Sequence, residues 1–405
     1  MARILFLTQV LPYPLNTGAR IRQYYVLRHL SRAHEVTLAS FVRSDDAPEH
    51  VSRLQAFCQA VHTVPMLRSR WRDGRAVVKG LLTHLPVLIA RDEIDLMQRT
   101  IGNLLADGAF DVLHADQVSM AQYGLLGNGT RRVLDLHNAM YVVTERLAAH
   151  EQNPLKRQVL QREVHTLARY EAGLCARYDQ VTFVSNDDRQ LIERQIDRWK
   201  VRVPDRRFTT IPICVDPSEK QPIAPIEQPF RITTLGVMFW PPNAEGALWF
   251  AEEIWPRIFA RHPHLRFTIV GKNPPEYLAR LHGAHGIEVM GFVPDLDPIL
   301  AETAALVVPL RAGGGMRVKI VDAWCWGLPI VSTTIGAEGI EIRAGENILI
   351  ADTAEVFSQA VSDAYADQDL NRRLRLKGRR WVEDKYDWRN VYCAWDDVYE
   401  RLLRA

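Results

Sequence analysis

The residues best suited to chemistry lie together in one segment, 306–341, which reads LVVPLRAGGGMRVKIVDAWCWGLPIVSTTIGAEGIE. An apolar run that ends at Leu310 is followed by the glycines Gly313–Gly315, whose backbone amides carry no covering side chain. A helix is predicted directly after them, and free N–H groups at a helix N-terminus bind phosphate. Arg317 and Lys319 add two positive charges that suit a diphosphate. The segment therefore predicts a phosphate-binding loop.

Asp322 lies in the same predicted helix, and its carboxylate could accept hydrogen bonds from ribose hydroxyls. An ordinary strand–loop–helix, with glycines for packing and solvated cations, would explain each of these residues alone. Their occurrence in one cassette favours the binding loop, because a lone glycine-rich loop is a much weaker signal.

The elements that must position this loop are short apolar runs that alternate with segments of helical spacing, such as 22–32 and 243–262. The runs are rich in Val, Ile and Leu and lack polar alternation, which is typical of parallel strands buried on both faces. They span 3–8, 35–41, 110–115, 131–137, 180–185, 230–237, 265–271, 287–292, 306–310 and 328–334. Alternation of strand and helix predicts a doubly wound α/β protein.

One stretch interrupts the alternation. Residues 217–228, PSEKQPIAPIEQ, hold three prolines without periodicity and predict a linker. It would separate an N-terminal Rossmann-like domain, 1–216, from a C-terminal one, 229–387. We expect the two parallel sheets to face each other across a cleft, since such sheets bind ligands beyond the carboxyl ends of their strands. The amphipathic segment 388–405 is expected to be helical and to pack back on the first domain.

The bulk properties are those of an ordinary globular protein, with 405 residues, 24% of them charged, and a net charge of +2. This balance gives no support to a nucleic-acid partner. Five scattered cysteines without C-x-x-C spacing favour a reducing compartment and no metal site. Neither a signal peptide nor a run of about 18 apolar residues is found. We therefore expect a cytoplasmic protein that needs no cofactor.

The segment 66–82 is unusually basic, with four arginines and one lysine against Asp73 alone, and Trp71 lies inside the basic run. Basic residues interleaved with Trp and Leu suit an anionic lipid surface, which would make the protein peripheral on the inner face of the membrane. A solvated loop and helix explains the same residues equally well. Two acidic pairs, Asp187-Asp188 and Glu252-Glu253, are interpreted as solvated because adjacent helical residues do not converge on one point.

The 306–341 segment resembles the donor-binding signature of retaining glycosyltransferase family 4, which has the GT-B fold, and above all its bacterial exopolysaccharide and capsule branch. Other matching stretches follow in order along nearly the whole chain: 11–22, 111–116, 134–138, 169–189, 236–246, 269–275 and 291–296. The resemblance implies transfer of a sugar from a nucleotide-sugar donor to a saccharide or lipid-linked acceptor, with retention and without a metal. It also implies front-face attack, in which the donor phosphate helps to accept the proton.

The resemblance assigns roles to single residues. Gly18 would let the backbone approach the donor phosphates, and His137 with Asn138 would lie near the transferred sugar. Val293 would contact the nucleobase through its backbone. The resemblance thus implies a catalytic set of His137, Arg317 and Lys319, and a donor set of Gly18, Val293, Gly314, Gly315, Met316, Arg317, Lys319 and Asp322. A turn glycine at 18, a core histidine at 137 and a turn with a buried Phe292 are the structural alternatives, and His114 suits a site or a core equally.

Two departures from the family pattern concern specificity and charge. The family often carries two acidic residues with seven between them, but Gly314 stands at the first position and Asp322 at the second. The lost sugar contact would pass to amides of residues 313–316 or to Glu338.

The second departure is the loop after the first strand of the second domain. It carries Phe239, Trp240 and Asn243 where many relatives place an arginine and a lysine. Arg317 and Lys319 are the expected substitutes.

Three other functions remain open. A nucleotide-sugar epimerase of the same fold would need no acceptor surface. A non-catalytic, nucleotide-sugar-binding member of a polysaccharide assembly complex is favoured by the missing first acid, but the retained Arg317, Lys319, Asp322 and His137 oppose it. A dinucleotide oxidoreductase is disfavoured because TQVLPYPLNTGAR, not G-x-G-x-x-G, follows the first strand.

Overall fold

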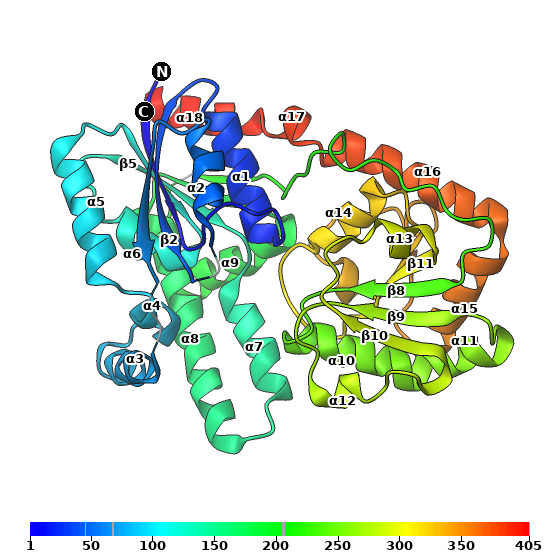
Figure 1. Ribbon diagram of the computed structural model, residues 1–405. Helices are drawn as coiled ribbons and strands as arrows, with labels where there is room; N and C mark the ends of the chain where they lie inside the picture. The colour runs from blue at the N-terminus through cyan, green and yellow to red at the C-terminus, as the bar shows by residue number, and fades with distance from the viewer. Residues whose placement is uncertain (45, 67–68, 205–206, 405) are drawn as a thin grey trace. The chain divides into compact units, whose positions relative to one another are not determined.

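The computed structural model describes residues 1–44, 46–66, 69–204 and 207–404, which form two compact units, each a parallel sheet flanked by helices (Figure 1). The first unit holds Met1–Cys214, Gly314–Met316 and the segment from Trp388 onwards, and the second holds Val215–Gly313 and Arg317–Asp387. The predicted α/β class with parallel sheets is confirmed.

The sheet of the first unit has seven parallel strands in the order β3-β2-β1-β4-β5-β6-β7. The strands are β1 (Arg3–Thr8), β2 (Glu35–Val42), β3 (Ala60–Pro65), β4 (Val112–Asp116), β5 (Arg131–Leu136), β6 (Gln180–Phe183) and β7 (Phe208–Thr210). From β1 the chain adds β2 and β3 on one side, and it then crosses back to add β4 to β7 on the other side. The junction of β1 and β4 is therefore the topological switch point, where ligands of such sheets bind.

Helices of the first unit cover this sheet and connect its strands (Figure 1). They are α1 (Gly18–Leu30), α2 (Pro48–Gln55), α3 (Arg70–Thr83), α4 (Val87–Arg91), α5 (Asp95–Asp107), η1 (Val118–Met120), α6 (Ala121–Gly124), α7 (Met140–His150), α8 (Pro154–Arg177), α9 (Asn186–Trp199), α17 (Trp388–Val391) and α18 (Ala394–Arg404). Their starts follow ordinary capping rules. Thr17, for example, accepts a hydrogen bond from the backbone N–H of Arg20 and so caps α1.

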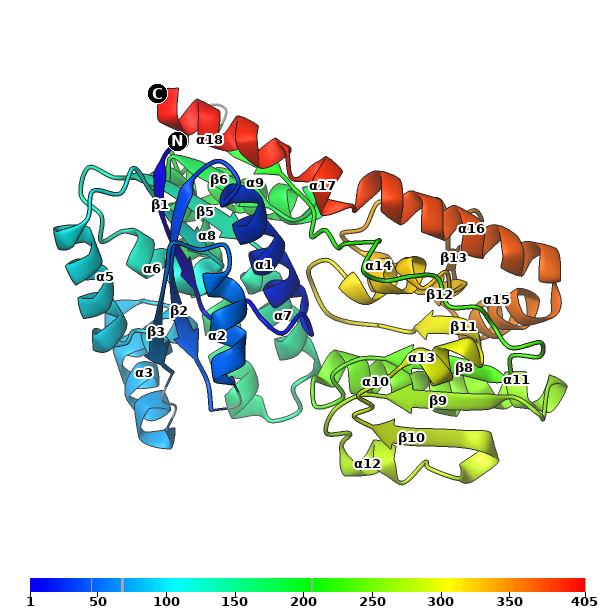
Figure 2. The same ribbon diagram turned by 45° about the horizontal axis from the view of Figure 1, so that its top comes forward.

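Helix α18 lies against the N-terminal part of the first unit, as both views show (Figure 1 and Figure 2). Its Tyr399 is buried, and the Tyr399 hydroxyl lies 2.8 Å from Nδ1 of His114. The His114 ring also stacks on Phe6, with ring centroids 4.1 Å apart. Burial lowers the pKa of His114 to about 3, so the imidazole is neutral. His114 is thus a core histidine rather than a site residue.

The sheet of the second unit has six parallel strands in the order β10-β9-β8-β11-β12-β13, which repeats the pattern of the first sheet. The strands are β8 (Arg231–Leu235), β9 (Arg266–Val270), β10 (Ile287–Gly291), β11 (Thr303–Val308), β12 (Ile330–Ser332) and β13 (Leu349–Ile350). The switch point of this sheet lies between β8 and β11. Any ligand of the second unit is therefore expected beyond the carboxyl ends of these two strands.

The helices of the second unit include one interruption that the sequence pattern does not indicate. They are α10 (Pro241–Trp249), η2 (Phe250–Ile254), α11 (Trp255–Arg261), α12 (Glu276–Ala279), η3 (Ala284–Gly286), α13 (Asp297–Ala301), α14 (Val318–Cys325), η4 (Ile335–Ala337), α15 (Ala354–Ala366) and α16 (Gln368–Lys385). The single helix expected over 243–262 is divided by the π-helical turn η2. Pro256 follows this turn and has no N–H to donate, which favours the wider turn before it.

Residues 217–228 form no helix or strand, and they belong to the second unit, within which they form backbone hydrogen bonds. The backbone N–H of Ile223 donates to Trp326 at 2.9 Å, and that of Ile226 donates to Ala301 at 3.0 Å. Across the described ranges of the chain, no helix combines the length and apolarity that a membrane crossing requires.

Candidate functional site

The glycine-rich segment joins the end of β11, a strand at the switch point of the second sheet, to the start of α14. Gly313 and Arg317 belong to the second unit, whereas Gly314–Met316 belong to the first. Gly313 and Gly315 have φ angles of 126° and 75°, a conformation that side chains with a Cβ atom rarely adopt. Gly314, Gly315 and Met316 complete the loop, and Arg317 directly precedes α14. The structure thus agrees with the sequence on a glycine-dependent turn before a helix.

The ammonium group of Lys319 lies at the switch point of the second sheet. Its ammonium donates hydrogen bonds to the carbonyl oxygen of Leu235, at 2.6 Å, and to Oδ1 of Asn243, at 3.0 Å. Leu235 is the last residue of β8, so the side chain reaches from α14 to the neighbouring strand. Burial, with a smaller contribution from Arg317, lowers the pKa of Lys319 to about 7. A poorly solvated cation of this kind gains most from an anionic ligand.

The other predicted donor residues occupy different surroundings. Asp322 forms an ion pair with Lys220. Burial of Lys220 opposes its charged form, but the Asp322 carboxylate outweighs this effect and raises the pKa of Lys220. Val293 follows β10 and is half-buried, and Phe292 beside it is 62% exposed, so the alternative of a buried Phe292 is wrong. Glu338 follows η4 and is half-buried.

A buried charged cluster lies at the carboxyl ends of β4 and β5 in the first unit. Nε and Nη2 of Arg22 donate to the two carboxylate oxygens of Asp135 at 2.6 and 2.8 Å, and both side chains are fully buried. Nη1 of Arg22 donates to the carbonyl oxygens of Ile211, at 2.7 Å, and Pro212, at 3.0 Å. Burial alone would raise the pKa of Asp135, but the Arg22 guanidinium outweighs it and holds that pKa well below its usual range.

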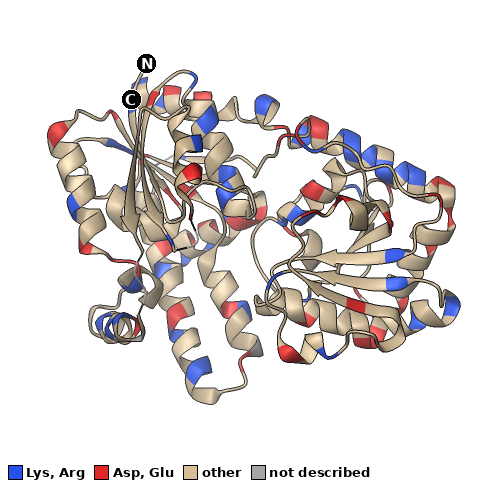
Figure 3. Ribbon diagram, in the orientation of Figure 1, with Lys and Arg blue, Asp and Glu red and all other residues tan. Residues whose placement is uncertain are grey.

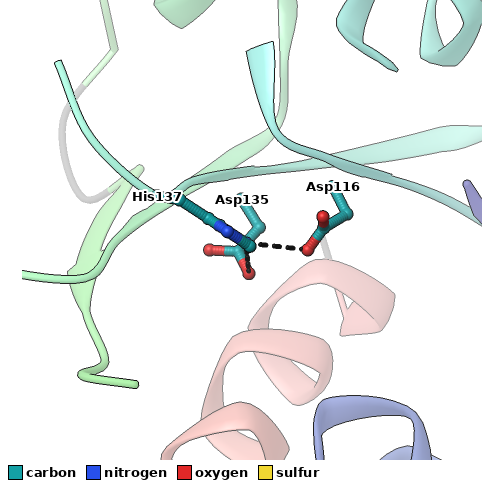
Figure 4. Close-up of side chains that lie close together, drawn as sticks. All are labelled: Asp116, Asp135 and His137. Atoms are coloured by element: carbon teal, nitrogen blue, oxygen red, sulfur yellow. Dashed lines mark hydrogen bonds and ion pairs between the residues drawn. The ribbon is translucent and has the colours of Figure 1, made fainter. Parts of the chain in front are cut away.

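His137 completes this cluster (Figure 4). Its Nε2 lies 2.9 Å from Oδ1 of Asp116 and 3.6 Å from Oδ2 of Asp135. Burial lowers the pKa of His137, but the two carboxylates more than offset this and raise it to about 9. Burial raises the pKa of Asp116, and the hydrogen bonds from His137 and Gln23 oppose that rise. His137 is therefore an imidazolium at neutral pH.

Asp116, Asp135 and His137 also offer ligand atoms that lie within 4.8 Å of one another, a spacing that could hold a metal ion. Their lone pairs are already engaged, because Arg22 donates two hydrogen bonds to Asp135 and His137 binds Asp116 through Nε2. The charges of two carboxylates, one guanidinium and one imidazolium sum to zero, so a cation would be uncompensated. The donor set suits an internal ion-pair network better than a metal.

The loop that carries His137 and Asn138 is anchored by two buried carboxylates. Asp188 accepts a hydrogen bond from the backbone N–H of Ala139 at 2.9 Å, and Glu171 accepts from Met140 and Tyr141 at 2.8 and 3.0 Å. These bonds satisfy the free N–H groups at the start of α7. The expectation that Asp188 is solvated is wrong, because it caps the neighbouring helix instead.

Gly18 opens α1, after the loop that follows β1, and is half-buried. Gly18, His137 and Asn138 thus belong to the first unit, whereas Val293, Lys319 and Glu338 belong to the second. The ion-pair partners of His137 were not among the predicted site residues. The runs DVLHAD and LDLH each carry an acidic residue and a histidine near the end of a predicted strand, and Arg22 lies within the matched stretch 11–22. These acidic residues at strand ends were the sequence signal that could have indicated the cluster.

His137 should make the stability of the protein depend on pH. Because its folded pKa of about 9 exceeds its ordinary value of 6.5, its contribution is complete below pH 6.5 and disappears as the pH rises through 9. We expect the stability difference between wild type and His137→Gln to shrink by on the order of 3 kcal/mol between about pH 6 and about pH 9.5. Urea unfolding of both proteins across this range measures it, and titrating groups that do not interact with His137 cancel in the difference. A constant difference would contradict an imidazolium at 137.

Comparison with known proteins assigns the second unit to a family. Residues 229–367 match the family model described as "Glycosyl transferases group 1". An uncharacterized 44.6 kDa protein in the cps region of Klebsiella pneumoniae is 22% identical over 410 residues, which cover 97% of this chain and 99% of that protein. The lipopolysaccharide core biosynthesis glycosyltransferase LpsE of Rhizobium meliloti is 27% identical over 121 residues, which cover 29% of this chain and 34% of LpsE.

Solved structures share the architecture over the full length. The crystal structure of Anabaena HepE in complex with UDP and glucose superimposes with a TM-score of 0.67, at 13% identity, and covers 99% of this chain and 100% of HepE. At this identity the likeness shows the fold, and that fold is GT-B. The matched family model assigns residues 229–367 to the group 1 glycosyltransferases. The cps-region relative extends the sequence similarity over nearly the whole chain.

Proposed function

We propose that the protein transfers a sugar from a nucleotide-sugar donor to a saccharide or lipid-linked saccharide acceptor during synthesis of a bacterial surface polysaccharide. Three relatives support this. One lies in a cps region, one is a lipopolysaccharide core glycosyltransferase, and HepE holds UDP and glucose in its crystal structure. Retention at the anomeric carbon and independence of a metal ion are typical of the family, and we propose both for this chain.

The observation that carries the proposal is the Lys319 ammonium at the switch point of the second sheet, in the helix that directly follows a glycine-dependent turn in the sequence. When the sugar leaves, negative charge develops on the diphosphate. Arg317 and Lys319 would stabilise that charge, and amides of Gly314, Gly315 and Met316 would add hydrogen bonds. Fixed charges and donors in a poorly hydrated site are worth several kcal/mol to such a transition state.

The remaining contacts are proposed from the same residues. Asp322 would bind ribose hydroxyls, Val293 would contact the base through its backbone, and Gly18 would admit the donor phosphates. His137, Asn138 and Glu338 would contact the sugar. Because Nε2 of His137 is engaged by Asp116, its sugar contact would come from the other side of the ring, as a fixed positive charge.

A thermal-shift screen against UDP, GDP, ADP and dTDP, free and sugar-linked, tests the proposal. A ligand that binds only the folded protein stabilises it by about 2.7 kcal/mol at about 100 times its dissociation constant, and so raises the melting temperature. We expect one nucleotide to give a clear rise. Incubation of the matching nucleotide-sugar without acceptor then separates an epimerase, which would isomerise it, from a transferase. Absence of any shift with all four nucleotides would count against the proposal.

We further propose that helix α3 binds an anionic membrane surface and so brings the protein to a lipid-linked acceptor. Trp71, Val78 and Leu82 are large, exposed apolar residues spaced seven and four apart, which puts them on one face of α3. Basic positions on α3 are blue in Figure 3. They are Arg72, Arg75 and Lys79, whereas Arg68 and the side chain of Arg70 lie outside the described residues.

Lipid vesicles test this surface directly. We expect co-sedimentation with vesicles that contain anionic lipid, and little with neutral vesicles, because each basic residue near such a surface contributes about 1 kcal/mol. Trp71→Ser combined with Leu82→Gln should reduce binding roughly tenfold, since both side chains would enter the interface. Leu155→Gln, an equally exposed apolar residue on α8, is the matched control. Equal sedimentation with both kinds of vesicle would rule the surface out.

A further inference from the structure

We propose that Asn243 is the positioning residue that holds the Lys319 ammonium for the donor diphosphate, an inference that rests on the proposed function. The loop after β8, residues 236–246, has no lysine or arginine of its own. The cation at this strand end comes instead from α14, and Asn243 is the side chain that receives it.

The Asn243 amide is oriented by contacts on both of its ends. Oδ1 accepts from the Lys319 ammonium at 3.0 Å, and Nδ2 donates to the carbonyl oxygen of Val237 at 3.0 Å. The backbone N–H of Asn243 donates to Trp240 at 3.0 Å, at the start of α10. These contacts with the loop and the helix start orient the amide, and the amide in turn orients Lys319.

Two glycines, Gly236 and Gly271, lie close to this contact. A Cβ atom on Gly236 would lie 2.9 Å from both the Lys319 ammonium and Nδ2 of Asn243. A Cβ atom on Gly271, after β9, would lie only 1.6 Å from the carbonyl oxygen of Gly236. A side chain at position 271 would collide with the backbone, and one at position 236 would displace the Lys319 and Asn243 side chains. The two glycines therefore leave room for Lys319 to bridge α14 and β8.

The chemistry of the two partners explains why an amide stands here. An ammonium has three N–H donors, and two are bound by the neutral acceptors Leu235 and Asn243. The third is left for a ligand, and no carboxylate among the described contacts of Lys319 neutralises its charge. Lys220 shows the contrast, because its partner is the carboxylate of Asp322 and its pKa is raised, with burial opposing. Asn243 thus orients the cation and leaves its charge for the diphosphate.

Substitution of Asn243 by Asp and by Ala gives opposite predictions for Lys319. The carboxylate of Asn243→Asp would pair with the ammonium, whereas Asn243→Ala would remove an acceptor that stabilises it. We expect the pH at which Lys319 becomes reactive to rise by at least about one unit in the first variant and to fall in the second. Competitive acetylation, followed by mass spectrometry of the peptide that contains Lys319, measures this in the free protein.

The same variants are then titrated with UDP as the probe. We expect wild-type affinity to fall roughly tenfold between about pH 7 and about pH 9, as Lys319 loses its proton. Both variants should bind UDP at least about tenfold more weakly at about pH 7, and Asn243→Asp should lose the pH dependence. Glu245→Gln, an exposed change on the same helix, is the control and should behave as wild type.

The outcomes distinguish failure of the positioning role of Asn243 from failure of the proposed function. Opposite shifts in Lys319 reactivity together with weaker UDP binding would support Asn243 as the positioning residue. Unchanged reactivity in both variants would overturn that role, even if wild type binds UDP and transfers sugar. Shifted reactivity in a protein that binds none of the four nucleoside diphosphates would overturn both this role and the proposed function. A merely structural role would move both variants in the same direction.

Discussion

Replacement of Arg22 by methionine is expected to lower the free energy of unfolding of the first unit by about 3–5 kcal/mol. The guanidinium and its partner Asp135 are both fully buried, and the pair is bidentate. Loss of the guanidinium leaves a buried carboxylate without its main counter-charge, and a methionine cannot replace the bonds to Ile211 and Pro212. Chemical denaturation, or the melting midpoint if unfolding is irreversible, measures the loss.

The double variant Arg22→Met with Asp135→Leu separates charge from packing. Removal of both charges should recover much of the loss, because a buried pair is often no more stable than apolar residues of similar volume. Arg53→Met, an exposed change on α2, is the matched control and should leave stability nearly unchanged. A single variant as stable as this control would show that the cluster around His137 does not depend on Arg22.

Replacement of Lys319 by methionine is expected to lower turnover by about 10²–10³-fold, the effect of removing one preorganised donor at a developing charge. Nucleotide binding should weaken at the same time, because the ammonium would contact the diphosphate before and after transfer. Arg317→Ala is expected to act in the same direction. Steady-state kinetics and UDP titration measure the two effects separately.

Lys377→Met serves as the control for Lys319, because it removes an exposed lysine of α16 in the same unit. The helix carries a row of basic residues, visible in Figure 3, so one loss there changes the local charge without touching the loop. Wild-type kinetics for both Lys319→Met and Arg317→Ala would remove the diphosphate assignment.

Much of the fold was predictable from local pattern. The strands that flank each switch point are buried over all or nearly all of their length, and burial on both faces produces the apolar runs of β1 and β11. The edge strands β3, β7 and β13 were missed, because AVHTVP, FTT and LI are partly exposed and too mixed or short to stand out. The facing of the two sheets across a cleft stays a prediction.

The candidate site was predictable only where residues adjoin in sequence. Gly313–Gly315, Arg317 and Lys319 form one cassette in the sequence, and Lys319 lies at the switch point of the second sheet. The partner of Lys319, Asn243, lies on another helix, and local pattern carries no signal for a contact of that range. The same applies to the Arg22 contact with Asp135, which only the completed sheet brings together. The assigned roles of all these residues stay predictions.

Because helix α18 belongs to the first unit, that unit is completed only by the last residues of the chain. The first unit needs Tyr399 and its neighbours to fill the space beside His114, yet nearly all of the second unit is encoded before them. During synthesis from the N-terminus, the second unit is therefore completed before the first. Until α18 has been synthesised, residues 1–214 expose the apolar surface that this helix later covers. Chaperone demand during synthesis should accordingly concentrate on the N-terminal half, and premature termination before α18 should leave a soluble second unit joined to an aggregation-prone first one.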